Sequence, residues 1–253
     1  MTVSRGKVLV WCASCQNQEA VWRAARAEIS SLPPSQVPGR AVSGPPGATM
    51  QGRSEFALAL WERASAAPST PVERYLAARN LEPFSTCDRL RYSPAARHPN
   101  GPLLPAMMAL VTDVEDTPLA VHRTYLRPDG SGKADIDPPK ATLGNICGGA
   151  IRLAPPAERM VVAEGTETAA SAGLIFGLPA WSAISAGNLG HNLQLPHLVR
   201  EIVIAADADL PGEAAAVAAA ARWRREGRVV QIARPNRAGT DFNDILMGRL
   251  NGS

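Results

Sequence analysis

The sequence has few cysteines, few lysines, few aromatic residues and no long apolar run. Four cysteines at scattered positions among 253 residues exclude a disulfide scaffold and indicate a reducing compartment. No stretch of about 18 apolar residues is present, so we expect no membrane-spanning helix. The apolar stretch near the N-terminus is too short for a secretory signal, and we therefore expect a cytoplasmic protein.

The positive charge is carried almost entirely by arginine. Only Lys7, Lys133 and Lys140 among the 26 basic residues are lysines. Arginine suits bidentate contacts with phosphate, but a GC-rich genome explains the same bias and is the commoner cause. A net charge of +3 is therefore weak evidence about binding partners.

The first part of the chain is divided by a linker. Residues 30–53 are rich in proline, glycine and serine and lack periodicity, which predicts a flexible segment. Before it, the pattern predicts a short strand over 6–11 and a helix over 19–29. Beyond it, helices are predicted over 54–66 and 71–79.

The middle of the chain changes from helical periodicity to alternation. The preceding helix begins with a capping-box pattern, with Thr70 as N-cap and Glu73 three residues later. Residues 103–153 then alternate and turn like antiparallel strands, and within them residues 143–153 predict a further pair of glycine-rich strands. We expect a small mixed α+β subdomain here.

From residue 158 onward, apolar strands alternate with helices. Continuous apolar strands separated by helices predict an α/β fold with a parallel sheet covered on both faces. The expected strands cover residues 160–165, 180–185, 201–207 and 229–233, and the expected helices cover 166–176, 211–226 and 241–247.

Acidic residues lie at the ends of three of these four strands. Glu164 ends the first strand, Asp207 and Asp209 end the third, and Asp241 and Asp244 lie just after the fourth. A single Asp-x-Asp is common in turns, but ligands of open parallel sheets bind at the carboxyl ends of the strands. If the first and third strands are neighbours, their carboxylates meet there, and such an oxygen cluster suits Mg²⁺ completed by substrate phosphates.

The segments that carry these acids are VVAEGTETAAS, IVIAADADLPG and GTDFNDIL. Together they resemble the Toprim domain of bacterial primases, topoisomerases and some nucleases. The resemblance implies that Glu164 is a general acid or base, that Asp207 and Asp209 bind metal, and that Asp241 and Asp244 form a further acidic cluster. Glu167 lies one residue before an additional acidic position of the family.

The preceding segments AVHRTYL, PPKATLG and GGAIRL resemble the subdomain that comes before Toprim in phage- and plasmid-type primases. That resemblance implies that Arg123 and Lys140, with the adjacent His122, contact phosphates of the template or nucleotide. A solvated strand face and a loop lysine are the structural alternatives for Arg123 and Lys140. Cations beside a metal site that handles triphosphates make the functional interpretation physically reasonable.

The N-terminal segment KVLVWCASCQNQEAVWRAAR resembles the second half of the primase zinc ribbon. Cys12 and Cys15 supply its second ligand pair, and no cysteine or histidine precedes them. A structural zinc needs four ligands, so we do not expect bound Zn²⁺. Either the chain as given starts late, or the ribbon has decayed, or the two cysteines are a strand-end pair.

The sequence thus predicts a Toprim-type doubly wound parallel sheet preceded by a smaller mixed α+β subdomain. Its expected parts are a partial zinc-ribbon-like segment (1–29), a linker (30–53), a primase-like subdomain (54–157) and a Toprim domain (158–253).

The resemblance implies a DNA primase of a phage, a plasmid or another mobile element. Such an enzyme uses Mg²⁺ or Mn²⁺ to make short primers from nucleoside triphosphates on single-stranded DNA. We expect a replicative helicase on a separate chain as its partner. A Toprim nuclease that uses the same metals and a non-catalytic nucleic-acid-binding remnant remain alternatives.

Overall fold

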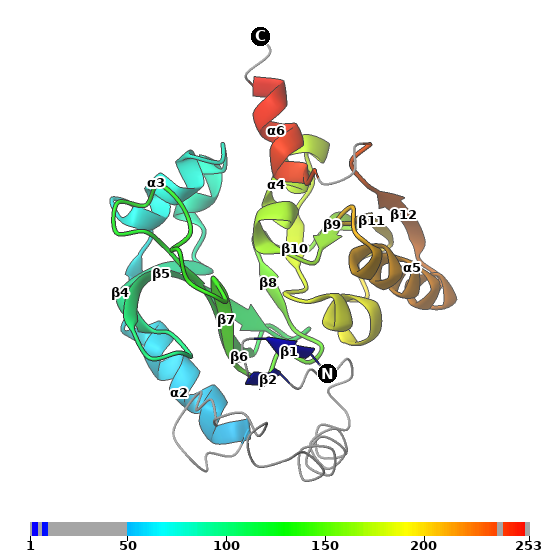
Figure 1. The fold of residues 1–253 in the computed structure, drawn as a ribbon. Helices are drawn as coiled ribbons and strands as arrows, with labels where there is room; N and C mark the ends of the chain where they lie inside the picture. The colour runs from blue at the N-terminus through cyan, green and yellow to red at the C-terminus, as the bar shows by residue number, and fades with distance from the viewer. Residues whose placement is uncertain (1, 5–6, 10–49, 237–239, 251–253) are drawn as a thin grey trace.

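The computed structural model describes residues 2–4, 7–9, 50–236 and 240–250 (Figure 1). Strands β1 (Thr2–Ser4) and β2 (Lys7–Leu9) pair in antiparallel fashion, and β2 lies within the strand predicted over 6–11. The described residues do not include Cys12, Cys15, the helix predicted over 19–29 or the linker up to residue 49.

Among the first described elements, α3 has a clear start signal. The elements are α2 (Met50–Glu62), the short strand β3 (Ser65–Ala66), α3 (Pro71–Ala77) and the 3₁₀ segment η2 (Glu82–Thr86). Thr70 is the N-cap of α3, as predicted, and its hydroxyl accepts a hydrogen bond from the Val72 amide at 3.1 Å. The expected capping box is shifted, because Glu73 accepts from the amide of Ser69 instead of that of Thr70.

An antiparallel group of strands follows, as the alternation predicts. It consists of β4 (Leu90–Arg97), β5 (Leu103–Thr112), β6 (Pro118–Tyr125), β7 (Lys140–Gly144) and β8 (Ala150–Arg152). The strand pair expected within 143–153 is wrong. Strand β7 pairs with β6, whereas β8 pairs with β5 and β10, so these two neighbours in sequence lie in different parts of the sheet.

The second half has the predicted alternation of strands and helices. Its elements are β9 (Arg159–Ala163), α4 (Thr166–Phe176), β10 (Ala180–Ser182), the π-helical turn η3 (Asn188–Asn192), β11 (Glu201–Ala205), α5 (Leu210–Arg225), β12 (Val229–Ala233) and α6 (Phe242–Leu250). Gly177, directly after α4, has φ +63°, a conformation that glycine adopts without strain and that ends the helix.

Strands β3 to β12 form one sheet, and its parallel part has the order β12-β11-β9-β10. From β9 the chain crosses to β10 on one side and later returns to β11 on the other. The strand order therefore reverses between β9 and β11, which is where an open parallel sheet offers a crevice for ligands. An antiparallel contact of β10 with β8 joins this part to the antiparallel strands.

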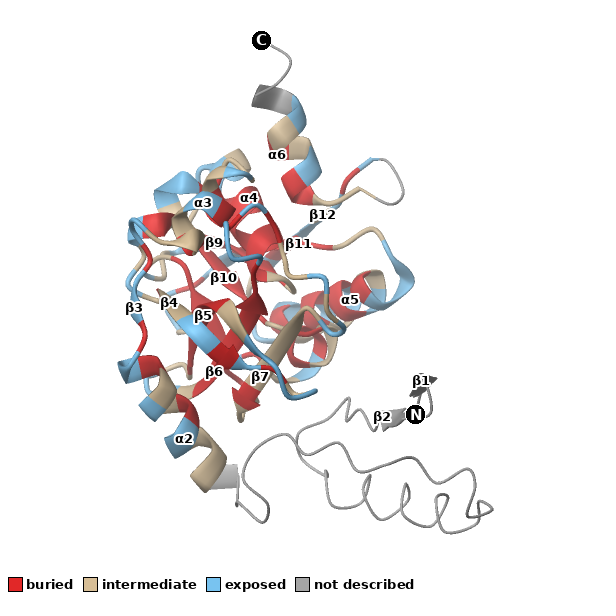
Figure 2. Ribbon diagram, turned by 60° about the vertical axis from the view of Figure 1, so that its left-hand side comes forward, coloured by how far each residue is buried: buried red, intermediate tan, exposed pale blue. Residues whose placement is uncertain are grey.

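Helices cover both faces of the parallel strands, as predicted. Met160 and Ile202 pack against α5 and η3 on one face, whereas Val161 and Val203 pack against α4 and α6 on the other. Figure 2 shows these central strands as buried, with the exposed residues on the outer sides of the helices.

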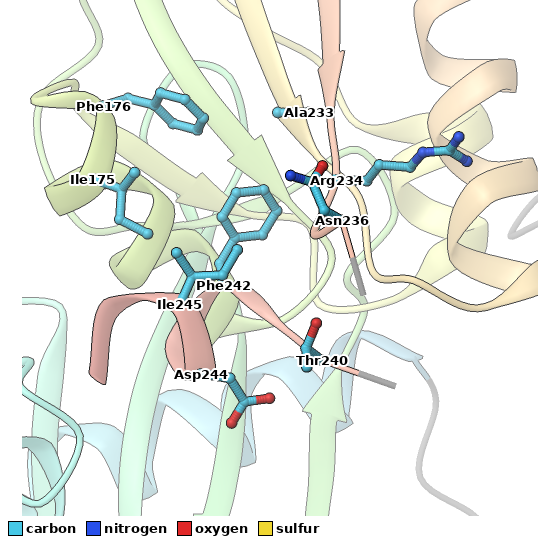
Figure 3. Close-up of a pocket in the computed structure, with 9 residues that line it drawn as sticks. All are labelled: Ile175, Phe176, Ala233, Arg234, Asn236, Thr240, Phe242, Asp244 and Ile245. Carbon is cyan, nitrogen blue, oxygen red and sulfur yellow. The ribbon is translucent and has the colours of Figure 1, made fainter. Parts of the chain in front are cut away.

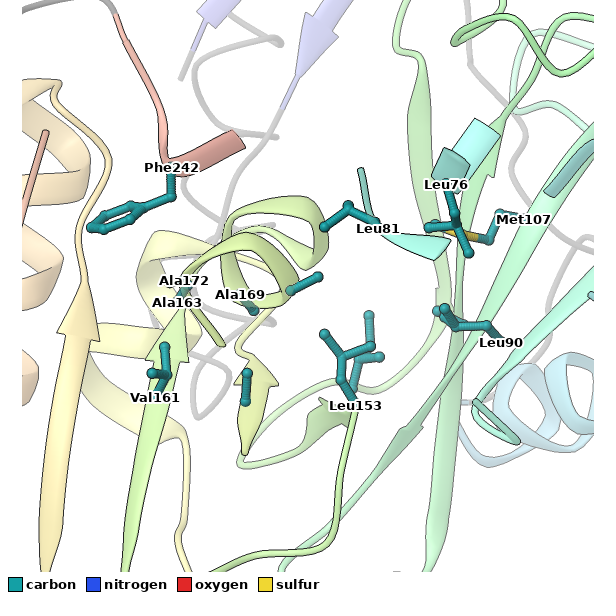
Figure 4. Packing of buried hydrophobic residues seen from close by; sticks show 14 of the residues in the cluster. Leu76, Leu81, Leu90, Met107, Leu153, Val161, Ala163, Ala169, Ala172 and Phe242 are labelled. Atoms are coloured by element: carbon teal, nitrogen blue, oxygen red, sulfur yellow. The ribbon is translucent and has the colours of Figure 1, made fainter. Parts of the chain in front are cut away.

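The core on the α4 face extends across both halves of the chain. In Figure 4, Leu76, Leu90 and Met107 of the first half lie opposite α4 of the second half, with Leu153 between them. The two sequence-defined halves therefore share apolar packing as well as a sheet. Among the described residues, no helix has the length and apolar character needed to cross a membrane.

Candidate functional site

A cleft of about 700 Å³ lies at the carboxyl ends of β9 and β11. It collects residues from both halves of the chain and contains seven of the sequence-predicted site residues. These are Glu164, Asp207, Asp209, Asp241, Asp244, His122 and Lys140. Six carboxylates line the cleft, including that of Glu167, together with the cationic side chains of Arg79, Lys133 and Lys140.

The register of two parallel strands brings the first acids together. Ala163 at the end of β9 pairs with Ala205 at the end of β11, so Glu164 and Asp207 emerge at the same edge of the sheet. Asp209 is the N-cap of α5, and its carboxylate accepts a hydrogen bond from the Gly212 amide at 2.7 Å. The first and third strands of the second half are therefore neighbours, as the prediction required.

The carboxylates at this edge oppose one another's ionisation. Burial raises the pKa of Glu164, and the charges of Asp207 and Asp209 raise it further. Burial also raises the pKa of Asp207, with further contributions from Asp209 and Asp241, against a hydrogen bond that Thr168 donates to Asp207 at 3.2 Å. A cation placed here would relieve both the repulsion and the desolvation.

Asp241 and Asp244 form a reciprocal cap at the start of α6. The Asp244 amide donates to the Asp241 carboxylate at 2.8 Å, and the Asp241 amide donates to the Asp244 carboxylate at 3.0 Å. This arrangement is a capping box with aspartate at both positions. Both side chains still line the cleft, so the cap holds these two acids at its edge.

The donor set of the cleft fits a hard divalent cation. Within the described residues, no three carboxylate, imidazole or thiol groups converge on one point as a closed metal cage. Mg²⁺ does not need such a cage, since one or two carboxylates usually hold it while waters and substrate phosphates complete its coordination. Glu164 and Asp207, both half-buried and short of compensating charge, have the chemistry for this role.

The cationic side of the cleft is organised around Glu167. Its carboxylate accepts a hydrogen bond from Lys140 at 2.6 Å and one from the Tyr75 hydroxyl at 2.6 Å, and the Lys133 ammonium lies 3.3 Å away. Burial alone would raise the pKa of Glu167, but the two lysine charges and these hydrogen bonds outweigh it and hold the pKa well below its usual value. Glu167 is therefore ionised in the fold.

His122 and Arg123 lie on opposite sides of β6, because successive strand residues point to opposite faces. His122 lines the cleft, where its Nδ1 is 2.8 Å from the Thr142 hydroxyl. Burial, followed by the charge of Lys140, lowers the pKa of His122 to about 3, so its ring is neutral. Arg123 does not line the cleft as the structure describes it. Its side chain is buried elsewhere and donates a hydrogen bond to the Arg97 carbonyl at 2.7 Å.

The backbone beside the acids departs from ordinary geometry. Ile184, two residues after β10, lines the cleft with φ +74°, which is rare for a β-branched residue. Its amide donates to the Glu164 carbonyl at 2.7 Å. Such outliers cost about 1–3 kcal/mol and tend to occur at functional sites.

Several residues of the cleft or its support were missed at the level of sequence, among them Lys133, Thr168 and Tyr75. Lys133 carried a signal, since it is one of only three lysines in the chain. Thr168 lies in the first turn of α4, which begins directly after Glu164 and Gly165, and its hydroxyl is therefore near the same edge. Tyr75 gave no signal, because its contact with Glu167 depends on packing between α3 and α4.

A second hollow, of about 450 Å³, lies between the end of α4, the end of β12 and the start of α6 (Figure 3). Phe176 and Phe242 form its apolar wall, with ring centroids 6.1 Å apart. Asp244 lines both hollows and is the only one of the predicted acids at this second one, which is otherwise largely apolar.

Comparison with protein families agrees with this architecture. Residues 159–252 match the Toprim domain family, and residues 51–153 match a domain of unknown function, DUF7146. No curated protein matches the chain. The carboxylates of the cleft therefore lie at the sheet edge of the segment that matches the Toprim family.

Solved structures match the fold over most of the chain. The catalytic core of the Escherichia coli primase matches with 12% identity and a TM-score of 0.51, covering 77% of this chain and 75% of its own. The primase fragment of the bacteriophage T7 primase-helicase matches with 16% identity and a TM-score of 0.50, covering 84% and 79%. A DnaG primase catalytic domain bound to single-stranded DNA matches with 14% identity and a TM-score of 0.51, covering 79% and 75%. The chain has the fold of the DnaG-type primase catalytic cores.

Proposed function

We propose that this chain is a DNA primase that joins nucleoside triphosphates into short primers on single-stranded DNA. The observation that carries the proposal is the cleft itself, which combines desolvated carboxylates at the Toprim sheet edge with Lys133 from the loop before β7 and Lys140 from the start of β7. The relative bound to single-stranded DNA and the phage primase-helicase fragment support a single-stranded template and a replicative helicase as partners.

Each group of residues has a part in the reaction. The 3′-hydroxyl oxygen attacks the α-phosphorus, pyrophosphate leaves, and the hydroxyl proton passes to a base. Glu164, whose pKa is raised, is suited to take this proton, and Lys140 faces the phosphates. Asp207 and Asp209, with Glu164, Asp241 and Asp244 nearby, would hold Mg²⁺ or Mn²⁺. Such an ion neutralises the triphosphate and lowers the pKa of the hydroxyl.

Primer synthesis by the purified full chain tests this function. The assay contains single-stranded DNA, labelled nucleoside triphosphates and Mg²⁺ or Mn²⁺, and compares the chain with Asp207→Ala and with Glu201→Gln. Glu201 is the first residue of β11, at the end of the strand away from the cleft, and forms an ion pair with Arg159 at 3.5 Å. Its substitution therefore leaves the cleft intact.

We expect short products from the unaltered chain and from Glu201→Gln, and none from Asp207→Ala. Synthesis that persists in Asp207→Ala would overturn the proposed metal site. A shortened template without products would favour a nuclease, and an intact template without products would favour a non-catalytic protein.

A further inference from the structure

Glu167 occupies an unusual position for a carboxylate. It is the second residue of α4, only 8% of its surface is exposed, and its side chain crosses to the other half of the chain. Its three partners come from three separate places, namely Tyr75 in α3, Lys133 in the loop before β7 and Lys140 at the start of β7. One carboxylate in the Toprim domain therefore gathers three groups that the preceding domain supplies.

The contacts fix where the two ammonium groups lie. Lys140 binds one carboxylate oxygen at 2.6 Å, whereas Lys133 lies 3.3 Å from the other. The Tyr75 hydroxyl, which is fully buried, binds that second oxygen and limits rotation of the carboxylate. The two lysine side chains keep about a third of their surface exposed, so their ammonium groups remain accessible from the cleft.

We propose that Glu167 is a positioning residue that holds Lys133 and Lys140 as a fixed pair of cations for the triphosphate of the incoming nucleotide. This inference rests on the proposed function. Two lysines and one glutamate leave one net positive charge, which lies beside the carboxylates that would hold the divalent cation. A triphosphate can then contact the metal on one side and the lysine pair on the other.

Positioning matters because lysine side chains are long and flexible. Each has four rotatable bonds, and ordering them only when the nucleotide binds would reduce affinity. Glu167 orders both lysines beforehand through contacts that are already buried. Charge alone predicts the opposite effect, because removal of the negative Glu167 would make the cleft more attractive to a triphosphate. Glu167→Gln therefore separates the two explanations.

The first experiment observes the lysines directly and requires no catalysis. The chain has three lysines, so lysine labelled with ¹³C at Cε gives three side-chain signals, which Lys133→Arg and Lys140→Arg assign. In the unaltered chain we expect the Lys133 and Lys140 signals to be displaced from that of free lysine and to shift together as inorganic triphosphate is added. In Glu167→Gln both signals should move toward free lysine, and the Kd for triphosphate should rise about tenfold.

The second experiment measures primer synthesis. In Glu167→Gln we expect the KM for nucleoside triphosphates to rise about tenfold while kcat changes by less than about twofold, since the residue does not touch the reacting atoms. The matched control Glu201→Gln should leave both constants unchanged. A general loss of folded protein would lower the apparent kcat and leave KM as it was, which would overturn the positioning role.

Other outcomes also decide the question. Lysine signals that are unchanged in Glu167→Gln, or triphosphate binding that becomes tighter, would overturn the inference. If Glu167→Gln does not fold, Tyr75→Phe replaces it, because this variant removes only the hydrogen bond that orients the carboxylate. Tyr75→Phe should raise the Kd for triphosphate about threefold. An unchanged Kd would contradict the proposal. The proposed function fails on a different result: the unaltered chain makes no primers although its lysine pair binds triphosphate.

Discussion

The hydroxyl of Tyr75 donates a 2.6 Å hydrogen bond to the carboxylate of Glu167, a residue 92 positions further along the chain. The bond joins α3 of the first half to α4 of the second half in a buried environment. Both groups lose water in the fold, so each depends on the other for its hydrogen bond.

Tyr75→Phe should therefore destabilise the chain. Hydrogen bonds to charged groups contribute about 1.5–3 kcal/mol, and we expect a loss of about 2 kcal/mol in the free energy of unfolding. Urea denaturation followed by circular dichroism measures this loss, with Tyr92→Phe, at a half-buried tyrosine of β4, as the comparison. Equal stability of Tyr75→Phe and the unaltered chain would show that the bond contributes nothing.

His122 should make the fold sensitive to mild acid. Its pKa is about 3 in the fold, where burial and Lys140 oppose protonation, but about 6.5 in an unfolded chain. The unfolded chain therefore binds a proton that the folded chain does not, and stability falls as the pH drops from about 6.5 toward 3. At pH 5 the loss relative to pH 8 is about 2 kcal/mol.

His122→Asn removes the titrating ring and retains a group that can bond to Thr142. Denaturation at pH 8 and pH 5 should show a smaller difference in stability for this variant, by about 2 kcal/mol. The remaining acid sensitivity comes from groups such as Glu167, whose depressed pKa stabilises the fold above about pH 4 and ceases to do so as the pH falls further. Identical pH profiles for the variant and the unaltered chain would refute the assignment.

Asp207→Asn should stabilise the metal-free chain. The pKa of Asp207 is raised in the fold, so its ionised form at neutral pH weakens the fold, and this penalty grows as the pH rises through that pKa. Asparagine keeps an oxygen for the Thr168 hydroxyl and removes the charge. In the presence of EDTA we expect Tm to increase by about 2–4 °C.

Mg²⁺ should reverse the order of these two proteins. A ligand that binds only the folded state stabilises it by about 2.7 kcal/mol at one hundred times its Kd. The unaltered chain should gain this stabilisation from Mg²⁺, and Asp207→Asn should gain little. A melting curve of the unaltered chain that Mg²⁺ leaves in place would contradict a metal site at these carboxylates.

Asp241 combines a cap with a negative charge, and two substitutions separate them. Asp241→Ala removes the acceptor for the Asp244 amide and should cost about 1 kcal/mol in stability, whereas Asp241→Asn keeps that acceptor. If its charge helps to hold the metal, both variants should weaken Mg²⁺ binding, measured by calorimetry. Full Mg²⁺ affinity in Asp241→Asn would restrict this residue to capping.

The elements of the second half could be read from the sequence with close bounds. Helix α4 and strand β12 span the residues predicted for them, because glycines flank the helix and the strand is apolar. The neighbouring positions of Glu164 and Asp207 followed from the rule that parallel strands end at one edge of the sheet.

Features that depend on tertiary packing could not be predicted in the same way. The alternation along β6 places His122 and Arg123 on opposite faces, but sequence alone does not say which face borders the cleft. The spacing of β7 and β8 resembles a hairpin, yet each finds its partner elsewhere in the sheet. The contact between Tyr75 and Glu167 joins helices from separate family segments, and no local pattern marks it.

The antiparallel seam between β8 and β10, where Arg152 pairs with Trp181, has a consequence for how this protein can be divided. Separation of the chain at residues 154–158 would leave each fragment with an unpaired strand edge and half of a shared apolar core. Each fragment alone would therefore be prone to aggregate, whereas the two produced together have complementary edges. The shared sheet and the shared apolar core therefore join the two halves into one structural unit.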